Sequence, residues 1–473
     1  MIGKILIVGA GTAGFVSALI LKTRFPNIDI TIVRSKNIGI IGVGEGTTEH
    51  WHHFMQMVGI DPTTLINRTD ATLKYGVMFE DWTKQPYLHS IPDNLNNIRI
   101  GQYPAGYGYL ISKQVPADNL TLKNIWNKEI VNSEQPYQYH FNTNKLNTFL
   151  EEISVSRNIK IIDDEIHEVV TENNTIQKVV GTENYTADFY IDCTGFKRLL
   201  INKLGAKWKS YSKWLTMNEA IAFPTKDTQE YNPYTLAKAM SSGWLWRIPV
   251  WGRWGNGYVF DSNYISADQA KQEAEEYLGF EIDVARHIKF DPGCLEKSWI
   301  GNCSAIGLSS NFVEPLEATS IGSTINQTFL LMHYIPNYNE HSINLYNKKV
   351  NLILENIRDF VITHYLTKKT DSKFWQDVQN IELPESLRNN LLRWKNNLPI
   401  KEDVVTTEYV LFHEQNWINL LYGIGWFEQN IKQEYEMINQ QYKDHVENKV
   451  DSFINAMHSG HKHKDFIRRI REQ

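Results

Sequence analysis

Cysteine, charge of one sign and uninterrupted hydrophobic runs are all scarce in this 473-residue sequence. Its three cysteines, Cys193, Cys294 and Cys303, are too few and too scattered for a disulfide framework, and they lack the spacing of a metal site. The formal net charge is -6 with both signs interspersed, so there is no basic stripe for nucleic acid and no polybasic segment for a membrane. These absences indicate a cytoplasmic protein that binds neither nucleic acid nor membranes.

One uncharged stretch, residues 5–21, is long enough to suggest a targeting signal or a short membrane span. Three glycines at regular spacing interrupt it, and a strand, a turn and a helix explain the pattern better. We predict a buried strand over residues 4–8, a helix after the glycines and a second strand over residues 28–33. This βαβ unit would open a parallel sheet, and such sheets bind ligands beyond the carboxyl ends of their strands.

The turn after the first strand carries the motif GAGTAG. In such motifs glycine allows a tight turn, close approach of the backbone to a pyrophosphate, and contact between helix and strand, while the helix N-terminus supplies N–H groups. The motif therefore predicts a dinucleotide site. The residues of the motif that we expect to bind the cofactor are Gly9, Gly11, Thr12, Ala13 and Gly14.

The end of the second strand departs from the usual dinucleotide pattern. An acidic residue that binds the ribose hydroxyls is expected there, but the sequence has Arg34. Arginine at this position could bind an additional phosphate, as in NADP, or stack on the adenine. Arg34 is therefore counted among the cofactor-binding residues, with both alternatives open.

Two later segments favour FAD over a nicotinamide cofactor. Residues 187–196 and 299–307 each have the pattern of a strand followed by a glycine turn, at Gly195 and Gly307. In FAD enzymes of the glutathione-reductase-like type, similar segments return to the flavin, although each alone could be an ordinary buried strand. A second glycine fingerprint for NAD(P)H is absent from the sequence. We therefore expect a separate reductase to supply the reduced flavin.

The rest of the chain differs in composition from this first unit. Residues 75–135 and 205–300 are rich in Tyr, Trp, Asn and Gly, with short alternating runs that predict antiparallel strands. After about residue 320 the spacing becomes helical, as over 345–364 and 418–446. The predicted fold class is α/β: an FAD-binding, glutathione-reductase-like Rossmann module with an inserted antiparallel β layer and a helical C-terminal region.

We predict two units along the chain. Residues 1–320 would form the FAD-binding module, including the β insertions, and residues 321–473 would form a helical region that covers the substrate. The C-terminal region also holds a histidine cluster, His458, His461 and His463, among lysines and arginines. We interpret this cluster as solvated surface rather than as a metal site.

Four short motifs are dense in glycine, tryptophan and charged residues. They are GVGEGTT over residues 42–48, LKYG over 73–76, GWLWRIP over 243–249 and FVEPLEAT over 312–319. Together they resemble the flavin-dependent tryptophan halogenase family over nearly the whole chain. The chain length resembles that of compact bacterial and phage-type members.

The resemblance implies flavin and halide contacts for the first and last motifs. Gly44 and Glu45 match the family's loop at the flavin, although the next position holds glycine where another small residue is usual. Thr319 and Ser320 would bind the halide through amides at the N-terminus of a helix that we predict to begin at Ser320. The family usually has glycine at that position, so the choice among chloride, bromide and iodide stays open.

Lys74 matches the family's essential lysine. Its neighbours over residues 73–79 form an apolar, strand-like stretch, and a lysine buried there would have its charged form disfavoured. An exposed, solubilising lysine is the plain alternative. The resemblance, and not proximity in sequence, brings Glu317 beside it as the second catalytic residue.

The GWLWRIP motif also has a purely physical interpretation. Alternation along a strand places Trp244, Trp246 and Ile248 on one face, and we expect the glycines of residues 255–257 to supply the turn of a hairpin. Plain core packing would account for paired tryptophans equally well. In the family these aromatic residues wall the passage between flavin and substrate, so Trp246 is counted among the cofactor-binding residues.

The resemblance implies a halogenating enzyme. Reduced FAD and oxygen would oxidise a halide to hypohalous acid, which Lys74 directs to an electron-rich aromatic ring of indole or phenol type while Glu317 helps to remove the ring proton. Two alternatives stay open: a flavin-dependent aromatic monooxygenase on the same fold, and a non-catalytic flavin-binding redox protein. The identity of the substrate and the formation of a homo-oligomer are left open.

Overall fold

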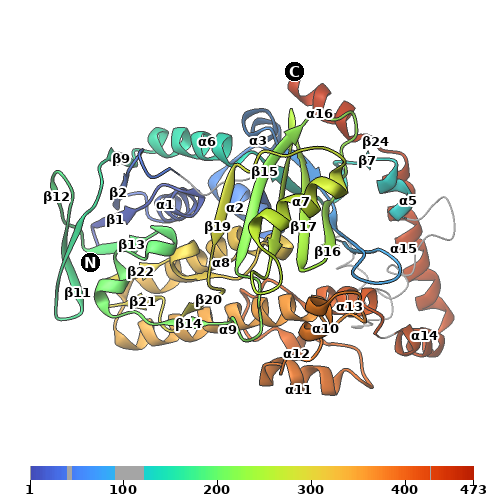
Figure 1. Ribbon diagram of the computed structural model, residues 1–473. Coiled ribbons are helices and arrows are strands. Elements are labelled where there is room, and N and C mark those ends of the chain that lie inside the picture. Colours follow the sequence, from blue (N-terminus) through green and yellow to red (C-terminus); the bar gives the residue numbers. More distant parts are fainter. Residues whose placement is uncertain (1, 40–44, 91–121, 427) are drawn as a thin grey trace.

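The computed structural model describes the chain in four stretches, residues 2–39, 45–90, 122–426 and 428–473. In Figure 1 the N-terminal sheet and its helices occupy one end of the molecule, and a larger sheet lies at the centre. The C-terminal helices run beneath both sheets and up the opposite end. The predicted α/β class is confirmed.

Six strands of the described residues form the N-terminal sheet. Its order in space is β21 (Trp299–Ile300), β22 (Cys303–Ala305), β13 (Phe189–Asp192), β1 (Lys4–Val8), β2 (Asp29–Arg34) and β9 (Lys160–Asp163). All neighbours pair in parallel except β21 with β22. The βαβ unit and the two later strand segments therefore meet in one sheet, as the sequence predicts.

Helix α1 (Thr12–Arg24) connects β1 to β2 and lies deep in the core. Its residues from Gly14 to Leu21 are all buried, so the helix has to be covered on every side. It contacts α6 (Thr143–Ser156) and α8 (Thr319–Tyr334), and the hydroxyls of Ser17 and Thr328 lie 3.1 Å apart across the α1–α8 contact.

Within the part of the chain that the structure describes, the central sheet has seven strands. Its order is β19 (Arg286–Lys289), β15 (Glu219–Lys226), β18 (Arg253–Phe260), β17 (Gly243–Val250), β16 (Thr235–Met240), β5 (Gly76–Glu80) and β6 (Tyr87–Ser90). The described pairs are antiparallel except β5 with β16, which run parallel. The inserted layer is thus a mixed sheet rather than a purely antiparallel one, because the long connection from β5 to β16 permits a parallel pair.

The predicted turn of the β17–β18 hairpin is wrong. The chain turns at Trp251 and Gly252, where Gly252 has a φ of 86°. The glycines of residues 255–257 lie inside β18 instead. A Cβ on Gly257 would lie 2.0 Å from the ring of Trp246, so glycine is needed here to make room for a tryptophan on the neighbouring strand.

The chain after α8 is helical, as predicted. The stretch 418–446, however, is divided among three helices rather than continuous. The helices are α9 (Glu340–His364), α10 (Lys373–Val378), α11 (Glu385–Arg393), α12 (Lys401–Val404), α13 (Glu414–Gly423), α14 (Glu428–Met437), α15 (Gln440–His458) and α16 (His463–Arg471).

The remaining elements connect or flank the two large sheets. The other helices are α2 (His50–Val58), α3 (Pro62–Thr69), α5 (Leu122–Asn127) and α7 (Ala267–Leu278). The other strands are β3 (Glu45–Gly46), β4 (Thr72–Lys74), β7 (Ile130–Val131), β8 (Gln138–Phe141), β10 (Glu168–Glu172), β11 (Thr175–Val180), β12 (Asn184–Tyr185), β14 (Trp208–Ser210), β20 (Gly293–Leu295), β23 (Asn311–Phe312) and β24 (His461–Lys462).

The interpretation of the histidine cluster as surface is wrong for one member. His458 and His461 are exposed, but His463 is fully buried. Its Nε2 accepts a hydrogen bond of 2.9 Å from the backbone N–H of Leu73. The cause is helix α16, which returns to pack on α3 and β4 and so turns its first residue inward.

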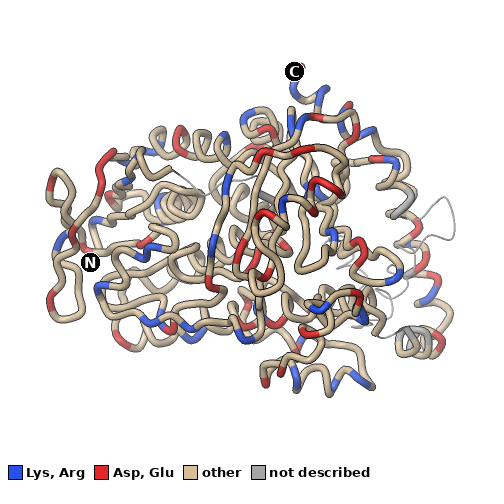
Figure 2. The backbone as a smooth tube through the Cα atoms, in the orientation of Figure 1, with Lys and Arg blue, Asp and Glu red and all other residues tan. Residues whose placement is uncertain are grey.

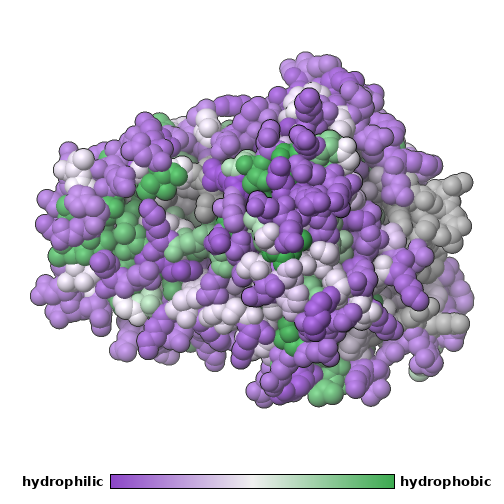
Figure 3. Space-filling model, viewed as in Figure 1, coloured by the Kyte–Doolittle hydropathy of each residue, from purple (hydrophilic) through white to green (hydrophobic). Residues whose placement is uncertain are grey.

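The surface carries charges of both signs without a single-sign stripe on the face shown in Figure 2. The same face is mostly hydrophilic, with small separate hydrophobic patches (Figure 3). Within the described residues, no helix has both the length and the apolar character needed to cross a membrane. The three cysteines are free.

Candidate active site

A cavity of about 990 Å³ is lined by residues from both large sheets and from α1, α6 and the start of α8. One part of its wall, here the nucleotide side, consists of the glycine motif with Arg34, Glu151 and Gly195. Another part, here the reactive side, includes Lys74, Trp244, Glu317 and Ser320. Residues that the sequence singled out from distant places thus share one cavity.

The glycines of the nucleotide side have different surroundings. A Cβ on Gly9 would lie 2.2 Å from the carbonyl oxygen of Cys193, and one on Gly14 would lie 2.0 Å from that of Gly9. Gly11 lines the cavity and has nothing within 4 Å of its Cβ position. It precedes α1, whose first turn has neither an acidic residue nor a side-chain cap. Free N–H groups at a helix N-terminus beside open space fit an anion.

Arg34 lies in the cavity wall but is already paired. Its two terminal nitrogens donate to both carboxylate oxygens of Glu151 on α6, at 2.5 and 2.6 Å. The pair neutralises the charge that an additional phosphate would need, which argues against the NADP alternative. The pair also brings the carboxylate of Glu151 into the cavity wall beside the end of β2. Nε of Arg34 is buried without a partner in the protein.

Asn147 is a second contribution of α6 to the nucleotide side. Its Oδ1 accepts a hydrogen bond of 3.1 Å from the hydroxyl of Thr12, and both residues line the cavity. Its Nδ2 is buried without a partner in the protein. A buried amide N–H left without an acceptor costs about 1–3 kcal/mol. This donor therefore fits a ligand that carries acceptor oxygens.

Of the other residues predicted to contact the flavin, some line the cavity and one lies outside the described residues. Gly195 and Gly307 both line the cavity, each with a φ of 67° that favours glycine. They follow β13 and β22, as the two strand segments predict. Gly44 lies outside the described residues, and Glu45 begins β3.

The tryptophan strand forms a wall of the cavity. Trp244, Trp246 and Ile248 all line it, as alternation along β17 predicts. Trp244 Nε1 donates to Oε1 of Glu314 at 3.0 Å, and the hydroxyl of Tyr365 donates to the same oxygen at 2.6 Å. Burial raises the pKa of Glu314 to about 7, and these two donors offset it only in part.

Lys74 is buried on the reactive side, with 2% of its surface exposed. It ends β4, which pairs with β8, and its Nζ donates to the carbonyl oxygen of Thr47 at 2.8 Å. Burial lowers the pKa of Lys74 to about 8, against the opposing effect of the negative charges of Glu317 and Glu49. The amine and the ammonium are therefore both accessible near neutral pH.

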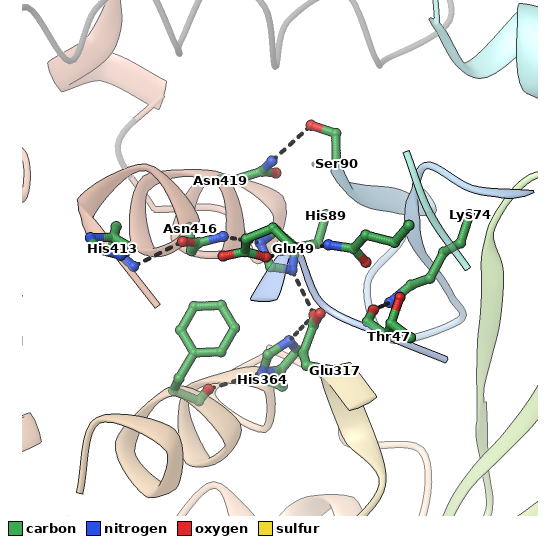
Figure 4. A network of polar contacts seen from close by, with 12 residues as sticks. Thr47, Glu49, Lys74, His89, Ser90, Glu317, His364, His413, Asn416 and Asn419 are labelled. Carbon is green, nitrogen blue, oxygen red and sulfur yellow. Dashed lines mark hydrogen bonds and ion pairs between the residues drawn. The ribbon is translucent and has the colours of Figure 1, made fainter. Parts of the chain in front are cut away.

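Glu317 points toward two histidine rings (Figure 4). Its Oε1 lies 2.7 Å from Nδ1 of His89 and 3.0 Å from Nε2 of His364. Burial alone would raise the pKa of Glu317, but the neighbouring His89 and His364 and their hydrogen bonds to the carboxylate outweigh burial and hold this pKa well below its usual range.

Helix α8 begins at Thr319, one residue earlier than predicted. Glu317 and Ala318 before it have positive φ values of 64° and 55°, so the backbone enters the helix through a strained loop. The helix N-terminus has no side-chain cap and no acidic residue in its first turn. Ser320 lines the cavity, whereas Thr319 is buried beside it.

Comparison with known proteins decides the family. The family model described as tryptophan halogenase matches residues 4–440 of the chain. The chain belongs to the tryptophan halogenase family. By this membership it is an enzyme of the flavin-dependent halogenase class.

Individual relatives cover most of the halogenase. A 7-chloro-L-tryptophan 6-halogenase of Kutzneria sp. (strain 744) is 34% identical over 84% of this chain and 86% of its own length. A tryptophan 6-halogenase of Streptomyces toxytricini is 32% identical over 85% of each chain. Among solved structures, a tryptophan C-6 flavin-dependent halogenase (chlorinase) from taromycin biosynthesis matches 100% of both chains with a TM-score of 0.89 at 26% identity.

Four residues of the halogenase site had not been expected from the sequence: Asn147, Glu151, His89 and His364. None of them lies in a recognisable motif. The one usable signal was helical spacing, because Asn147 and Glu151 are four positions apart and therefore share a face of α6. For the two histidines no such signal exists, since only the fold brings them to Glu317.

Proposed function

We propose that this halogenase uses reduced FAD, oxygen and a halide to halogenate an electron-rich aromatic compound of indole or phenol type. The observation that carries the proposal is that two buried ionisable residues, Lys74 and Glu317, line the same cavity as the glycine motif. The two curated relatives are named for action on tryptophan or chlorotryptophan, so indoles, tryptophan included, are the first substrates to test.

Three features of the nucleotide side support FAD as the cofactor: the open space at Gly11, the uncapped start of α1 and the unpartnered amide of Asn147. Bound reduced flavin would supply, together with oxygen, the two-electron oxidation that converts a halide to hypohalous acid. We propose that the residues that hold it are Gly9, Gly11, Thr12, Ala13, Arg34, Gly44, Glu45, Gly195, Trp246 and Gly307, together with Asn147 and Glu151. Gly14 would act indirectly, because its lack of a side chain lets α1 pack closely against Gly9.

The start of α8 is the proposed halide site. The backbone N–H groups of Thr319 and Ser320 lie at an uncapped helix N-terminus, where the helix dipole favours an anion. The hydroxyl-bearing Ser320 faces the cavity in place of the family's usual glycine.

Lys74 and Glu317 are the proposed catalytic residues. The ammonium of Lys74 would hold hypohalous acid by a hydrogen bond, or its free amine would form an N–halogen bond with release of water. Either form would fix where the electrophile meets the aromatic ring. Glu317 would then accept the proton that leaves the ring carbon as the carbon–halogen bond is completed.

Two further parts of the proposal concern the whole chain. Residues 1–320 would hold the cofactor and residues 321–473 would cover the substrate. A separate flavin reductase would supply reduced FAD. The paired tryptophans of β17 would keep the aromatic substrate from the flavin, so that only the small electrophile passes between them.

The test is a reconstituted reaction. The purified chain is supplied with FAD, an independent NADH-dependent flavin reductase, oxygen and either chloride, bromide or iodide, and it is tested on a panel of indoles and phenols. Mass spectrometry should show a product in which a ring hydrogen is replaced by halogen. A product that gains oxygen would support a monooxygenase instead. Formation of hydrogen peroxide alone with every compound would contradict both halogenation and monooxygenation.

A further inference from the structure

The carboxylate of Glu317 is held by two histidines from distant parts of the chain. His89 comes from β6 and His364 from the end of α9, and both contact the same oxygen, Oε1 (Figure 4). All three side chains are buried: Glu317 is 7% exposed, His89 6% and His364 0%. The positions of the protons on the two rings can therefore be derived from their hydrogen-bond partners in the protein.

The proton of His89 is fixed by Asn416. Oδ1 of Asn416 accepts the backbone N–H of His413 at 2.9 Å, which sets the orientation of the amide. Nδ2 of Asn416 therefore donates to Nε2 of His89, 3.1 Å away. A ring nitrogen that accepts carries no hydrogen, so His89 is neutral and its Nδ1–H donates to Glu317.

The protons of His364 follow by the same reasoning. Its Nδ1 lies 2.9 Å from the carbonyl oxygen of Phe360, which can only accept, so Nδ1 carries a hydrogen. A neutral His364 would then present the lone pair of Nε2 to Oε1 of Glu317 at 3.0 Å. Two lone pairs at that distance repel, so one more proton must lie between His364 and Glu317. The pair is either an imidazolium with a carboxylate or a neutral imidazole with a carboxylic acid.

The surroundings favour the imidazolium with the carboxylate. Oε1 of Glu317 also accepts the N–H of His89, and a carboxylate accepts two N–H donors more strongly than a neutral acid does. Among the described residues, the titratable groups that interact electrostatically with Glu317 are Tyr87 and His89 on β6, His364 on α9 and Lys74 on β4. An ammonium at Lys74 also favours the carboxylate, and none of these groups places a second negative charge beside it at neutral pH.

We propose that His364 is a positioning residue for halogenation, which stays protonated and thereby keeps the buried Glu317 ionised as the base for the ring proton. This inference rests on the role proposed above for Glu317. A carboxylate buried without such a partner would be largely protonated and could not accept a proton. His89 would orient Glu317 by its hydrogen bond, and His364 would supply the charge.

The protonation of His364 can be measured without any halogenation assay. The ring nitrogens are observed by NMR in protein labelled with 15N-histidine, and the signals of His364 are assigned by their loss in His364→Gln. We expect both ring nitrogens to be protonated at pH 7 in the wild type, and one of them to lose its proton in Glu317→Gln, where the negative charge is gone. A neutral His364 ring in the wild type would overturn the inference. This result is independent of whether the chain halogenates anything.

The effect on the reaction is tested with His364→Gln, because glutamine can still donate a hydrogen bond to Glu317 but carries no charge. The acidic limb of the pH profile of halogenation should move up by about 1–3 pH units, since Glu317 loses its cationic partner. A purely structural role of His364 predicts an unchanged limb in this variant. The matched control is His287→Gln, which removes another histidine–glutamate pair, that with Glu219 at 2.6 Å. It should leave the limb in place.

Discussion

The nucleotide side and the reactive side of the cavity are built in different ways. The nucleotide side is built mainly on one short segment, residues 9–14, in which backbone geometry dictates the residue type, and α6 adds Asn147 and Glu151 to it. The reactive side is assembled from separate elements: His89 and Glu317, for example, are 228 positions apart and touch only because β6 and the loop before α8 meet. The centre of the nucleotide side is therefore encoded in one segment, whereas the reactive side is encoded by the whole fold.

This difference predicts that the two sides can be disabled separately. Most of the nucleotide side consists of backbone groups and open space, so it should respond most strongly to added volume. The reactive side works through the charges of a few buried side chains, so it should respond to changes that keep the volume and remove the charge. The following substitutions test this division.

Lys74→Met should have the largest effect. Methionine keeps most of the side-chain length but neither donates a hydrogen bond nor forms an N–halogen bond. We expect halogenation to fall by a factor on the order of 10² to 10⁴, while FAD affinity and the oxidation of reduced flavin by oxygen stay near the wild-type values.

Product mass spectrometry and stopped-flow flavin absorbance measure the two effects side by side. The matched control is Lys238→Met, because Lys238 is a half-buried lysine of the central sheet whose Nζ pairs with Glu80 at 3.0 Å. If Lys74→Met and Lys238→Met lose halogenation equally, Lys74 has no special part in the reaction.

Gly11→Ala and Gly14→Ala should differ although both add a single methyl group. In Gly14→Ala the new Cβ meets the backbone oxygen of Gly9, so stability should fall by about 1–3 kcal/mol. In Gly11→Ala the new Cβ meets only the cavity, so thermal stability without flavin should be unchanged. FAD should then bind about tenfold more weakly, a cost of about 1.4 kcal/mol.

Thermal unfolding and flavin fluorescence titration give these two quantities. Equal unfolding temperatures for the two variants would contradict the distinction between a glycine required for packing and a glycine required for ligand approach.

The features that could be predicted from the sequence are those that depend on residues close together in the chain. The glycine motif, the parallel strands and the tryptophan face of β17 could be predicted because each depends on neighbours in sequence. The predicted turn near Gly257 is wrong because that glycine makes room for Trp246 on another strand. The burial of His463 could not be predicted because it depends on where α16 packs. His364 was missed since a lone histidine in a helix has no distinctive pattern.

Glu151→Gln should have a smaller effect, confined to the nucleotide side. The change keeps the volume and removes the charge that pairs with Arg34. If this pair lies at the adenosine part of FAD, the affinity for FAD should fall about fivefold, or about 1 kcal/mol. The affinity for FMN, which lacks the adenosine, should stay the same.

The matched control is Glu152→Gln, because Glu152 is the adjacent residue on α6 but pairs with Arg68 outside the cavity. Titrations of each variant with both flavins measure the effect. An equal loss for FAD and FMN would place the pair elsewhere than at the adenosine.

Glu314→Gln should have the smallest effect. It distinguishes the pH dependence of the contribution of Glu314 to stability from that of Glu317, which lies in the same motif. Because burial raises the pKa of Glu314 from 4.5 to about 7, the native state holds its proton more tightly than the unfolded state does. Its contribution to stability is therefore fully present below pH 4.5 and is lost as the pH rises through about 7. Glu317 has a lowered pKa, so its contribution is present near neutral pH and is lost only in acid.

Glutamine at position 314 cannot ionise but can still accept from Trp244 and Tyr365. The variant should therefore be more stable than the wild type at pH 8, by an amount on the order of 1 kcal/mol, and equally stable at about pH 4, below the unfolded pKa. Urea unfolding at the two pH values measures this difference. The opposite order would mean that Glu314 is ionised in the native state, in which case the tryptophan wall would carry a charge beside the path of the electrophile.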